Sequence, residues 1–161
     1  MFRINNNLTY KLLLIFSILV LLSASFIQYV LGHKPCNLCL IERVPYFLAI
    51  VLILFFLFFK KYEKLINTLI LILFLFGFFV SLYHIGIEQG YFKESFVCNL
   101  EFSSNKITAQ DLLRELEEKT ISCKVVTFRL FGFSLATFNA VISLSISVIM
   151  IMILKNYEKN K

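Results

Sequence analysis

The sequence predicts an all-α integral membrane protein: a four-transmembrane-helix bundle that forms a single membrane domain over residues 1–161. Hydrophobic residues make up 59% of the chain, which is more apolar surface than a soluble domain of this length can bury. These residues gather in four long runs that basic residues flank, as expected for membrane anchors rather than for a nucleic-acid-binding surface. The runs do not alternate between polar and apolar residues, which excludes the strands of a membrane barrel.

The four apolar runs are expected to span the bilayer at about residues 12–31, 41–59, 65–85 and 133–154. A helix needs about 20 apolar residues to cross a hydrocarbon core of about 30 Å. The second run reaches this length only if it takes in Leu40 and Ile41, which places Glu42 and Arg43 at the membrane surface. The first run continues too far past its small-residue triplet at residues 23–25 to be a cleaved signal peptide.

Two loops, at about residues 32–40 and 86–131, lie on the same side of the predicted bundle. The longer loop contains a capping-box-like start at Thr108, and leucines then recur at helical spacing opposite glutamates. This pattern predicts a short amphipathic helix over about residues 107–119 that lies on the bilayer surface. A helix that merely fills the loop has the same pattern.

Four spans place both termini on one side of the membrane, and the charges favour the cytoplasm for that side. The basic residues divide equally, but those on the side of the termini lie in short segments next to the spans. All four cysteines fall on the other side and outside the expected spans. Cysteines gathered on one face are typical of an oxidising compartment, so we expect that face to be extracytoplasmic.

Cys36-Asn37-Leu38-Cys39 is a C-x-x-C motif at the expected start of the second helix. A helix N-terminus stabilises a thiolate, and thiols in such motifs often have a lowered pKa. Arg43 follows Cys39 by four residues, so the two share one helical face. The guanidinium there favours either a thiolate or an anion on a bound cofactor.

Cys98 and Cys123 lie in the long loop, and the stretch between them could close into a disulfide loop. Such a bridge can be a simple staple that stabilises by about 3 kcal/mol. A zinc site built from all four thiols would call for a second C-x-x-C, so we expect no metal. Two exchanging pairs would instead form a relay, because each thiol–disulfide exchange moves two electrons.

The segment Lys34-Pro35-Cys36-Asn37-Leu38-Cys39-Leu40-Ile41-Glu42-Arg43 resembles the signature of the bacterial disulfide-bond formation protein B (DsbB) family. Further matches are Gln28-Tyr29-Val30, Tyr83-His84 and the Phe131-Gly132 turn before the fourth span. The number of spans, the unequal loops and the widely spaced second cysteine pair also fit. The resemblance covers nearly the whole chain.

The resemblance implies a role for each candidate site residue. Cys98, paired with Cys123, would form a mixed disulfide with a reduced periplasmic thioredoxin-like thiol oxidase (DsbA-like). Cys123 would then attack Cys36, paired with Cys39, and Cys39 would pass electrons to a quinone, either ubiquinone or menaquinone. Arg43 would bind the quinone and stabilise its charge, with His84 as a weaker candidate near the same site, while Glu42 would pair with a neighbour or face water.

The resemblance therefore implies a protein-dithiol:quinone oxidoreductase in the bacterial inner membrane, with cytoplasmic termini and periplasmic cysteines. One alternative is a non-catalytic tetraspan protein with two structural disulfides. Another is a relay that carries reducing electrons outward, but such relays usually keep cysteines inside the spans. A transporter is disfavoured because ionisable residues and prolines are nearly absent from the expected spans.

Overall fold

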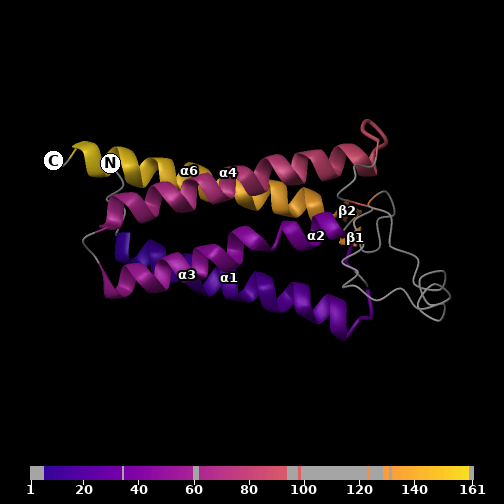
Figure 1. Cartoon of the computed structure of the whole chain (residues 1–161), viewed down its shortest axis with the longest axis horizontal. Coiled ribbons are helices and arrows are strands. Elements are labelled where there is room, and N and C mark those ends of the chain that lie inside the picture. Colours follow the sequence, from indigo (N-terminus) through magenta and orange to yellow (C-terminus); the bar gives the residue numbers. More distant parts are fainter. Residues whose placement is uncertain are drawn as a thin grey trace, which may run out of the picture.

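The computed structural model describes residues 6–33, 35–59, 62–93, 98, 123, 129–130 and 132–159. Long helices dominate these ranges and lie along the long axis of the molecule (Figure 1). Within them, four helices are long and apolar enough to cross a membrane. The chain is therefore an all-α integral membrane protein built on a four-helix bundle, which confirms the predicted fold class.

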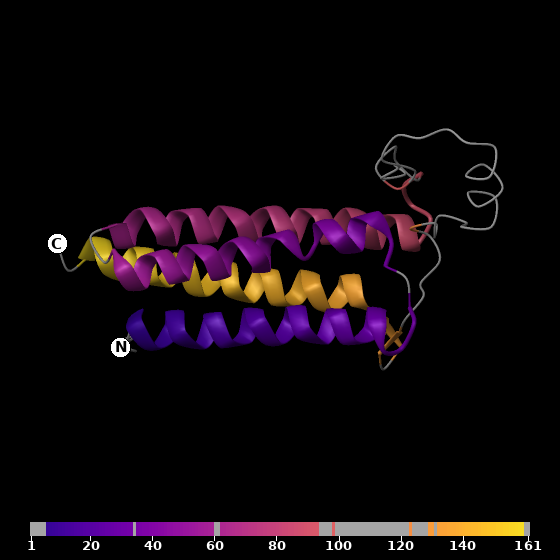
Figure 2. The ribbon, with the colours of Figure 1, turned by 60° about the horizontal axis from the view of Figure 1, so that its bottom comes forward.

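The bundle consists of α1 (Asn6–Tyr29), the broken pair α2 (Asn37–Ile41) and α3 (Val44–Phe58), α4 (Glu63–Glu88) and α6 (Leu135–Lys159). The most extensive helix pair is α4 with α6, whereas α1 packs on α3 and α3 on α4. The start of α1 and the end of α6 lie at the same end of the bundle (Figures 1 and 2). The opposite end carries α2 and the small hairpin described below.

The second span is broken into α2 (Asn37–Ile41) and α3 (Val44–Phe58). Pro45 explains the break, because it has no N–H with which to bond the carbonyl of Ile41, four residues earlier. Glu42 and Arg43 form the turn between the two pieces, and their N–H groups bond the carbonyls of Leu38 and Leu40. The two pieces together span Asn37–Phe58, a length sufficient to cross a membrane.

A two-stranded hairpin precedes the last helix. Strand β1 (Arg129–Leu130) pairs antiparallel with β2 (Phe133–Ser134), and Gly132 between them has φ 86°, a left-handed conformation that suits glycine. The backbone N–H of Thr137 donates to the Ser134 hydroxyl, an N-cap arrangement that begins α6 at Leu135.

The helix bounds differ from the expected spans mostly at the ends. The first helix begins at Asn6 and ends at Tyr29, where the span was expected over residues 12–31, and α4 exceeds residues 65–85 at both ends. The fourth span was expected to begin at 133, but the backbone at 133–134 pairs with β1. The predicted loop helix over residues 107–119 lies outside the described residues.

Two buried clusters divide the interior. The apolar cluster fills the half of the bundle that contains the start of α1 and is built from Tyr10, Leu13, Tyr46, Ala49, Ile53, Phe56, Ile66, Ile70, Phe74, Ile146, Met150 and Ile153. The cysteine cluster lies at the other end and contains Cys36, Leu38, Ile87, Cys98 and Cys123, with Cys39, Ile41, Val80 and Tyr83 packed against them.

Candidate functional site

The C-x-x-C motif lies where the first loop meets α2. Cys36 is the N-cap residue of this helix, and the backbone N–H of Cys39 donates to its sulfur at 3.3 Å. The two sulfur atoms lie 2.7 Å apart. Cys36 is buried and Cys39 is half-buried, so the two sulfurs meet while facing different surroundings.

Cys39 corrects one expectation, because it lies inside α2 and within the Asn37–Phe58 span rather than outside every span. It occupies the first turn of that span, at the end of the bundle where Cys98 and Cys123 join the cysteine cluster. The location of the described cysteines at one end of the bundle therefore stands, even though one of them belongs to a helix that can cross the membrane.

A buried histidine and glutamate stand behind Cys36. His84 Nε2 lies 3.5 Å from the Cys36 sulfur, and His84 Nδ1 lies 2.9 Å from Glu42 Oε1. Only 3% of His84 and 7% of Glu42 is exposed. Burial of a carboxylate is costly without a partner, and the imidazole supplies one. A second carboxylate, Glu88 on the same helix, lies 3.7 Å from His84 Nε2.

The contacts with Cys39 and His84 change the pKa of the Cys36 thiol. A hydrogen bond from the Cys39 thiol, and then one from His84, lower the pKa of the Cys36 thiol well below its usual range, against the opposing effect of burial. The thiolate is the reactive form of cysteine in disulfide exchange. Cys36 is therefore prepared to leave or to attack as a thiolate.

Arg43 points to the opposite side of the turn from Glu42. Its Nη1 donates to Gln28 Oε1 at 2.7 Å, and its Nη2 donates to the carbonyl of Ala24 at 3.5 Å. Both acceptors belong to α1, so the arginine ties the turn between α2 and α3 to the neighbouring helix. Arg43 and Cys39 line the same cavity, although the helix that was expected to carry both ends at Ile41.

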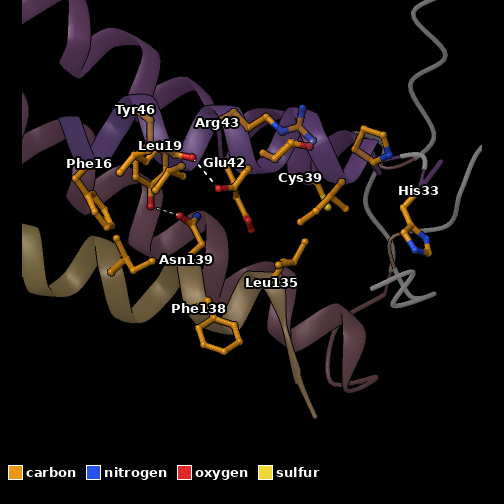
Figure 3. Close-up of a pocket in the computed structure, with 16 residues that line it drawn as sticks. Phe16, Leu19, His33, Cys39, Glu42, Arg43, Tyr46, Leu135, Phe138 and Asn139 are labelled. Atoms are coloured by element: carbon orange, nitrogen blue, oxygen red, sulfur yellow. Dashed lines mark hydrogen bonds between the residues drawn. The ribbon is translucent and has the colours of Figure 1, made fainter. Parts of the chain in front are cut away.

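A cavity of about 360 Å³ opens beside Cys39 and Arg43 (Figure 3). Helix α1 provides most of one wall and α6 the facing wall, where Leu135, Phe138 and Asn139 are labelled in the figure. The volume falls within the range of small-molecule sites, about 300–1,000 Å³, which are largely apolar with a few polar groups. The residues that line it are Phe16, Leu19, Val20, Ser23, Ala24, Ile27, His33, Pro35, Cys39, Glu42, Arg43, Tyr46, Leu135, Phe138, Asn139 and Ile142.

A chain of hydrogen bonds fixes the floor of this cavity. The Tyr46 hydroxyl donates to Asn139 Oδ1 at 2.5 Å (Figure 3), and Asn139 Nδ2 donates to the Ser81 hydroxyl at 2.7 Å. The Ser81 hydroxyl donates in turn to the carbonyl of Gly77. The chain joins α3, α6 and α4, so the cavity has a wall of fixed shape on the side away from the cysteines.

The second cysteine pair forms a disulfide. Cys98 and Cys123 are bonded to each other, their Cα atoms lie 5.9 Å apart, and both side chains are almost fully buried. This bridge belongs to the same buried cluster as Cys36. The fold thus brings together the two pairs, although 59 residues of sequence separate Cys39 from Cys98.

The structure separates the two residues that were predicted as cofactor ligands beside Cys39. Arg43 lines the cavity, whereas His84 is absent from the cavity lining and contacts Cys36 instead. The contact between Glu42 and His84 was not foreseen, nor were the cavity residues of α1 and α6. A signal existed for Asn139, because an amide inside an apolar span usually has a partner there.

The same atoms could also hold a metal ion. The sulfurs of Cys36 and Cys39 and a ring nitrogen of His84 all lie within 4.8 Å of one another. Two thiols at this separation thus have two possible chemistries, disulfide exchange and metal ligation.

Comparisons with known proteins identify the family. The family model described as disulfide bond formation protein DsbB matches residues 6–153. The chain is also 26% identical over 151 residues to a protein of Rickettsia prowazekii (strain Madrid E) named "Uncharacterized protein RP370", an alignment that covers 92% of this chain and 88% of that protein. The match to the family model extends from the first turn of α1 almost to the end of α6 and includes both cysteine pairs. The chain therefore belongs to the DsbB family, the multi-pass membrane proteins of disulfide-bond formation.

Proposed function

We propose that this protein is a protein-dithiol:quinone oxidoreductase, which takes electrons from a periplasmic thioredoxin-like thiol oxidase and passes them to a membrane quinone. One observation carries the proposal. Cys39 lies 2.7 Å from the Cys36 sulfur and also lines the cavity that contains Arg43. One sulfur therefore touches both a disulfide partner and a site of suitable size for a small apolar molecule.

The cavity fits the head group of a quinone. Its walls are mainly aliphatic and aromatic side chains, which suit a lipid-soluble ring, and it lies between helices that can cross a membrane. Arg43 supplies a cation at the same place as the Cys39 sulfur. A bound quinone would accept two electrons and two protons. Both ubiquinone and menaquinone satisfy these requirements.

The thiol steps balance as exchanges. The partner's thiolate attacks the Cys98–Cys123 bond, which forms a mixed disulfide at Cys98 and leaves Cys123 as a thiolate. Cys123 then attacks Cys36, so that a Cys36–Cys123 bond forms, the Cys36–Cys39 bond breaks, and the electron pair stays on Cys39. When the partner's second thiol resolves the mixed disulfide, Cys98 attacks Cys123 and releases Cys36 as a thiolate. Two electrons have then moved to the C-x-x-C pair.

His84 and Arg43 stabilise negative charge at different sulfurs, His84 at Cys36 and Arg43 at Cys39. The contact of His84 Nε2 with Cys36 favours the thiolate at that sulfur, and Glu42 fixes the ring through Nδ1. Arg43 stabilises negative charge in the cavity, where Cys39 faces it. We therefore assign His84 to the thiol chemistry rather than to the quinone.

The proposed topology places both termini in the cytoplasm and the cysteine cluster on the periplasmic face. The start of α1 and the end of α6 lie together, at the end of the bundle away from α2 (Figure 2). A membrane-impermeant thiol reagent, added to intact spheroplasts, should label a cysteine introduced at Tyr91, which is 79% exposed just after α4, and leave a cysteine introduced at Tyr157 unlabelled. The reverse pattern would invert the proposed orientation.

One observation favours a second candidate, a tetraspan protein whose disulfides are inert. The side chains of Cys98 and Cys123 are only 2% and 1% exposed, whereas a bridge that meets a soluble protein must become accessible. The two candidates differ in one respect: an inert bridge stays oxidised when a reduced partner is supplied, while a relay bridge exchanges.

The test uses the purified protein in detergent, a reduced thioredoxin-like periplasmic protein and a soluble ubiquinone analogue without oxygen. We expect thiol-dependent loss of quinone absorbance that disappears in Cys39→Ser. The matched control is Ser145→Ala, which removes an exposed hydroxyl that donates to the Val141 carbonyl of its own helix and should react at the normal rate. If neither ubiquinone nor menaquinone analogues are reduced while the partner reacts with another oxidant, the inert-disulfide reading replaces this proposal.

A further inference from the structure

We propose that Cys36, Cys39 and His84, once the cysteine pair is reduced, form a binding site for a thiophilic divalent metal ion of the Zn²⁺ class. The three donor atoms lie within 4.8 Å of one another and come from two segments of the chain, the C-x-x-C motif and α4. The site differs from the four-thiol zinc site considered from the sequence, because a histidine takes the place of Cys98 and Cys123.

The donor distances suit tetrahedral coordination. With Zn–S bonds of about 2.3 Å and Zn–N bonds of about 2.0 Å, the sulfur and nitrogen ligands of one ion lie about 3.5 Å apart. The Cys36 sulfur and His84 Nε2 already lie 3.5 Å apart. The two sulfurs, at 2.7 Å, need to separate to about 3.8 Å to share the ion. Cys39 lies in the five-residue helix α2, and Cys36 is the N-cap residue of that helix.

Glu42 completes the arrangement that metal-binding histidines use. A ligating imidazole almost always gives its other N–H to a carboxylate or carbonyl, which fixes the tautomer and leaves the ligating nitrogen unprotonated. Here Nδ1 faces Glu42 Oε1 at 2.9 Å, and Nε2 faces the sulfur of Cys36. With Nδ1 held by Glu42, loss of the Nε2 proton that His84 shares with Cys36 leaves Nε2 able to ligate a metal.

The charge balance and the redox state of the cysteine pair decide whether the site binds a metal. Two thiolates and one divalent ion form a neutral group, which a buried place tolerates better than separate charges. Binding releases two protons, one from the Cys39 thiol and one from the Cys36–His84 pair, and transfers no electrons. The oxidised pair has no thiolate to offer, so the metal binds only the reduced protein.

The biological consequence rests on the proposed function. A metal on Cys36 and Cys39 would hold the relay in its reduced state and stop turnover until the ion leaves. Such a block would make excess zinc in the periplasm an inhibitor of disulfide formation through this protein.

The binding test contains neither quinone nor thiol partner, so its outcome is separate from that of the proposed function. The full chain carrying Cys98→Ser and Cys123→Ser, in detergent and without oxygen, is titrated with Co²⁺ before and after reduction. We expect the visible bands of tetrahedral Co²⁺ and thiolate charge-transfer absorption only after reduction, and their loss when Zn²⁺ is added. Absent bands, or equal bands in the oxidised protein, overturn the proposal.

Variants test the ligand set. His84→Gln should weaken Zn²⁺ binding at least tenfold, and Glu42→Gln by about tenfold, as loss of an outer carboxylate does. Thr68→Ala removes an exposed hydroxyl on the same helix that donates to the Lys64 carbonyl, and this variant should bind normally. His84→Cys should restore binding with stronger charge-transfer absorption, which guards against a His84→Gln protein that merely misfolds. Unchanged affinity in His84→Gln would show that the histidine is no ligand.

Discussion

The two buried clusters lie in the same bundle and are surrounded by the same lipid, yet they are built differently. The apolar cluster contains aliphatic and aromatic side chains, one methionine and two tyrosines, and it holds α1, α3, α4 and α6 together. The cysteine cluster borders a buried glutamate and a buried histidine, and it contains both cysteine pairs. Since ionisable groups are costly in a membrane, their concentration at one end marks that end as the place of chemistry.

The comparison separates what holds the protein together from what makes it react. Lipid is as apolar as the core, so the apolar cluster stabilises the bundle through close packing rather than through the hydrophobic effect. The cysteine cluster depends on pairs of specific atoms, such as Glu42 with His84. Substitutions in the apolar cluster should lower the free energy of unfolding and leave turnover unchanged. Substitutions in the cysteine cluster should lower turnover and leave the free energy of unfolding unchanged.

The largest expected effect is on turnover, from Cys36→Ser. Loss of this sulfur removes the attack point for Cys123, so quinone reduction should fall by about a thousandfold or more, as for other nucleophile knockouts. Unfolding by sodium dodecyl sulfate, followed by helical circular dichroism, should keep its midpoint. Residual turnover of a tenth or more would mean that Cys36 does not lie on the electron path.

A smaller kinetic effect is expected from Arg43→Ala. Hydrogen bonds to charged groups contribute about 1.5–3 kcal/mol, so the KM for the quinone analogue should rise at least tenfold. The KM for the thiol partner should stay constant, because Arg43 faces the cavity and α1. The KM of Arg43→Lys for the quinone analogue should lie between the values of the unaltered protein and of Arg43→Ala, because lysine keeps the charge. A rise confined to the KM for the thiol partner would show that Arg43 acts on the partner's reaction and not on quinone binding.

In the apolar cluster, Ile70→Ala should cost about 1–3 kcal/mol of unfolding free energy. Ile70 is 0% exposed, and its truncation leaves a cavity, although lipid removes most of the transfer cost that a soluble protein would suffer. Detergent unfolding measures the loss, and turnover per folded molecule should be unchanged. Ile72→Ala is the control, because Ile72 is 56% exposed on the same helix and should cost little.

The smallest effect should come from Asn139→Ala, which removes the bonds to Tyr46 and Ser81. Interhelical hydrogen bonds in membranes average about 0.6 kcal/mol each, so the loss should be near 1 kcal/mol. Tyr46→Phe breaks one of the two bonds and should cost about half as much by the same unfolding measurement. A larger cost for Tyr46→Phe would mean that its hydroxyl does more than bond Asn139.

The bundle could be predicted because the bilayer imposes a length on every helix that crosses it. The apolar runs therefore gave the number of long helices, and the segment from Lys34 to Arg43 placed the C-x-x-C motif correctly. The ends of the helices were less accurate, because polar residues such as Asn6 continue a helix beyond its apolar part. The break after Ile41 could have been read from Pro45, which removes one helical hydrogen bond.

The pairing of Glu42 with His84 could not be predicted in the same way. The two residues lie 42 positions apart, and apolar runs do not state which helix faces which. Helix faces that meet lipid and those that meet another helix are equally apolar, so the cavity walls on α1 and α6 were also invisible. The clue that remained was the rarity of ionisable groups near the spans, which suggests that those present contact each other.

The break at Glu42 and Arg43 has a further consequence for the timing of motion. A helix of five residues is too short to be stable by itself, whereas α3 and α4 are longer and pack against neighbouring helices. Hydrogen exchange should therefore be fastest at the amides of residues 37–41 and slow in the rest of the second span. We therefore expect the cysteine pair to open and close by local unwinding of α2, without unfolding of the bundle.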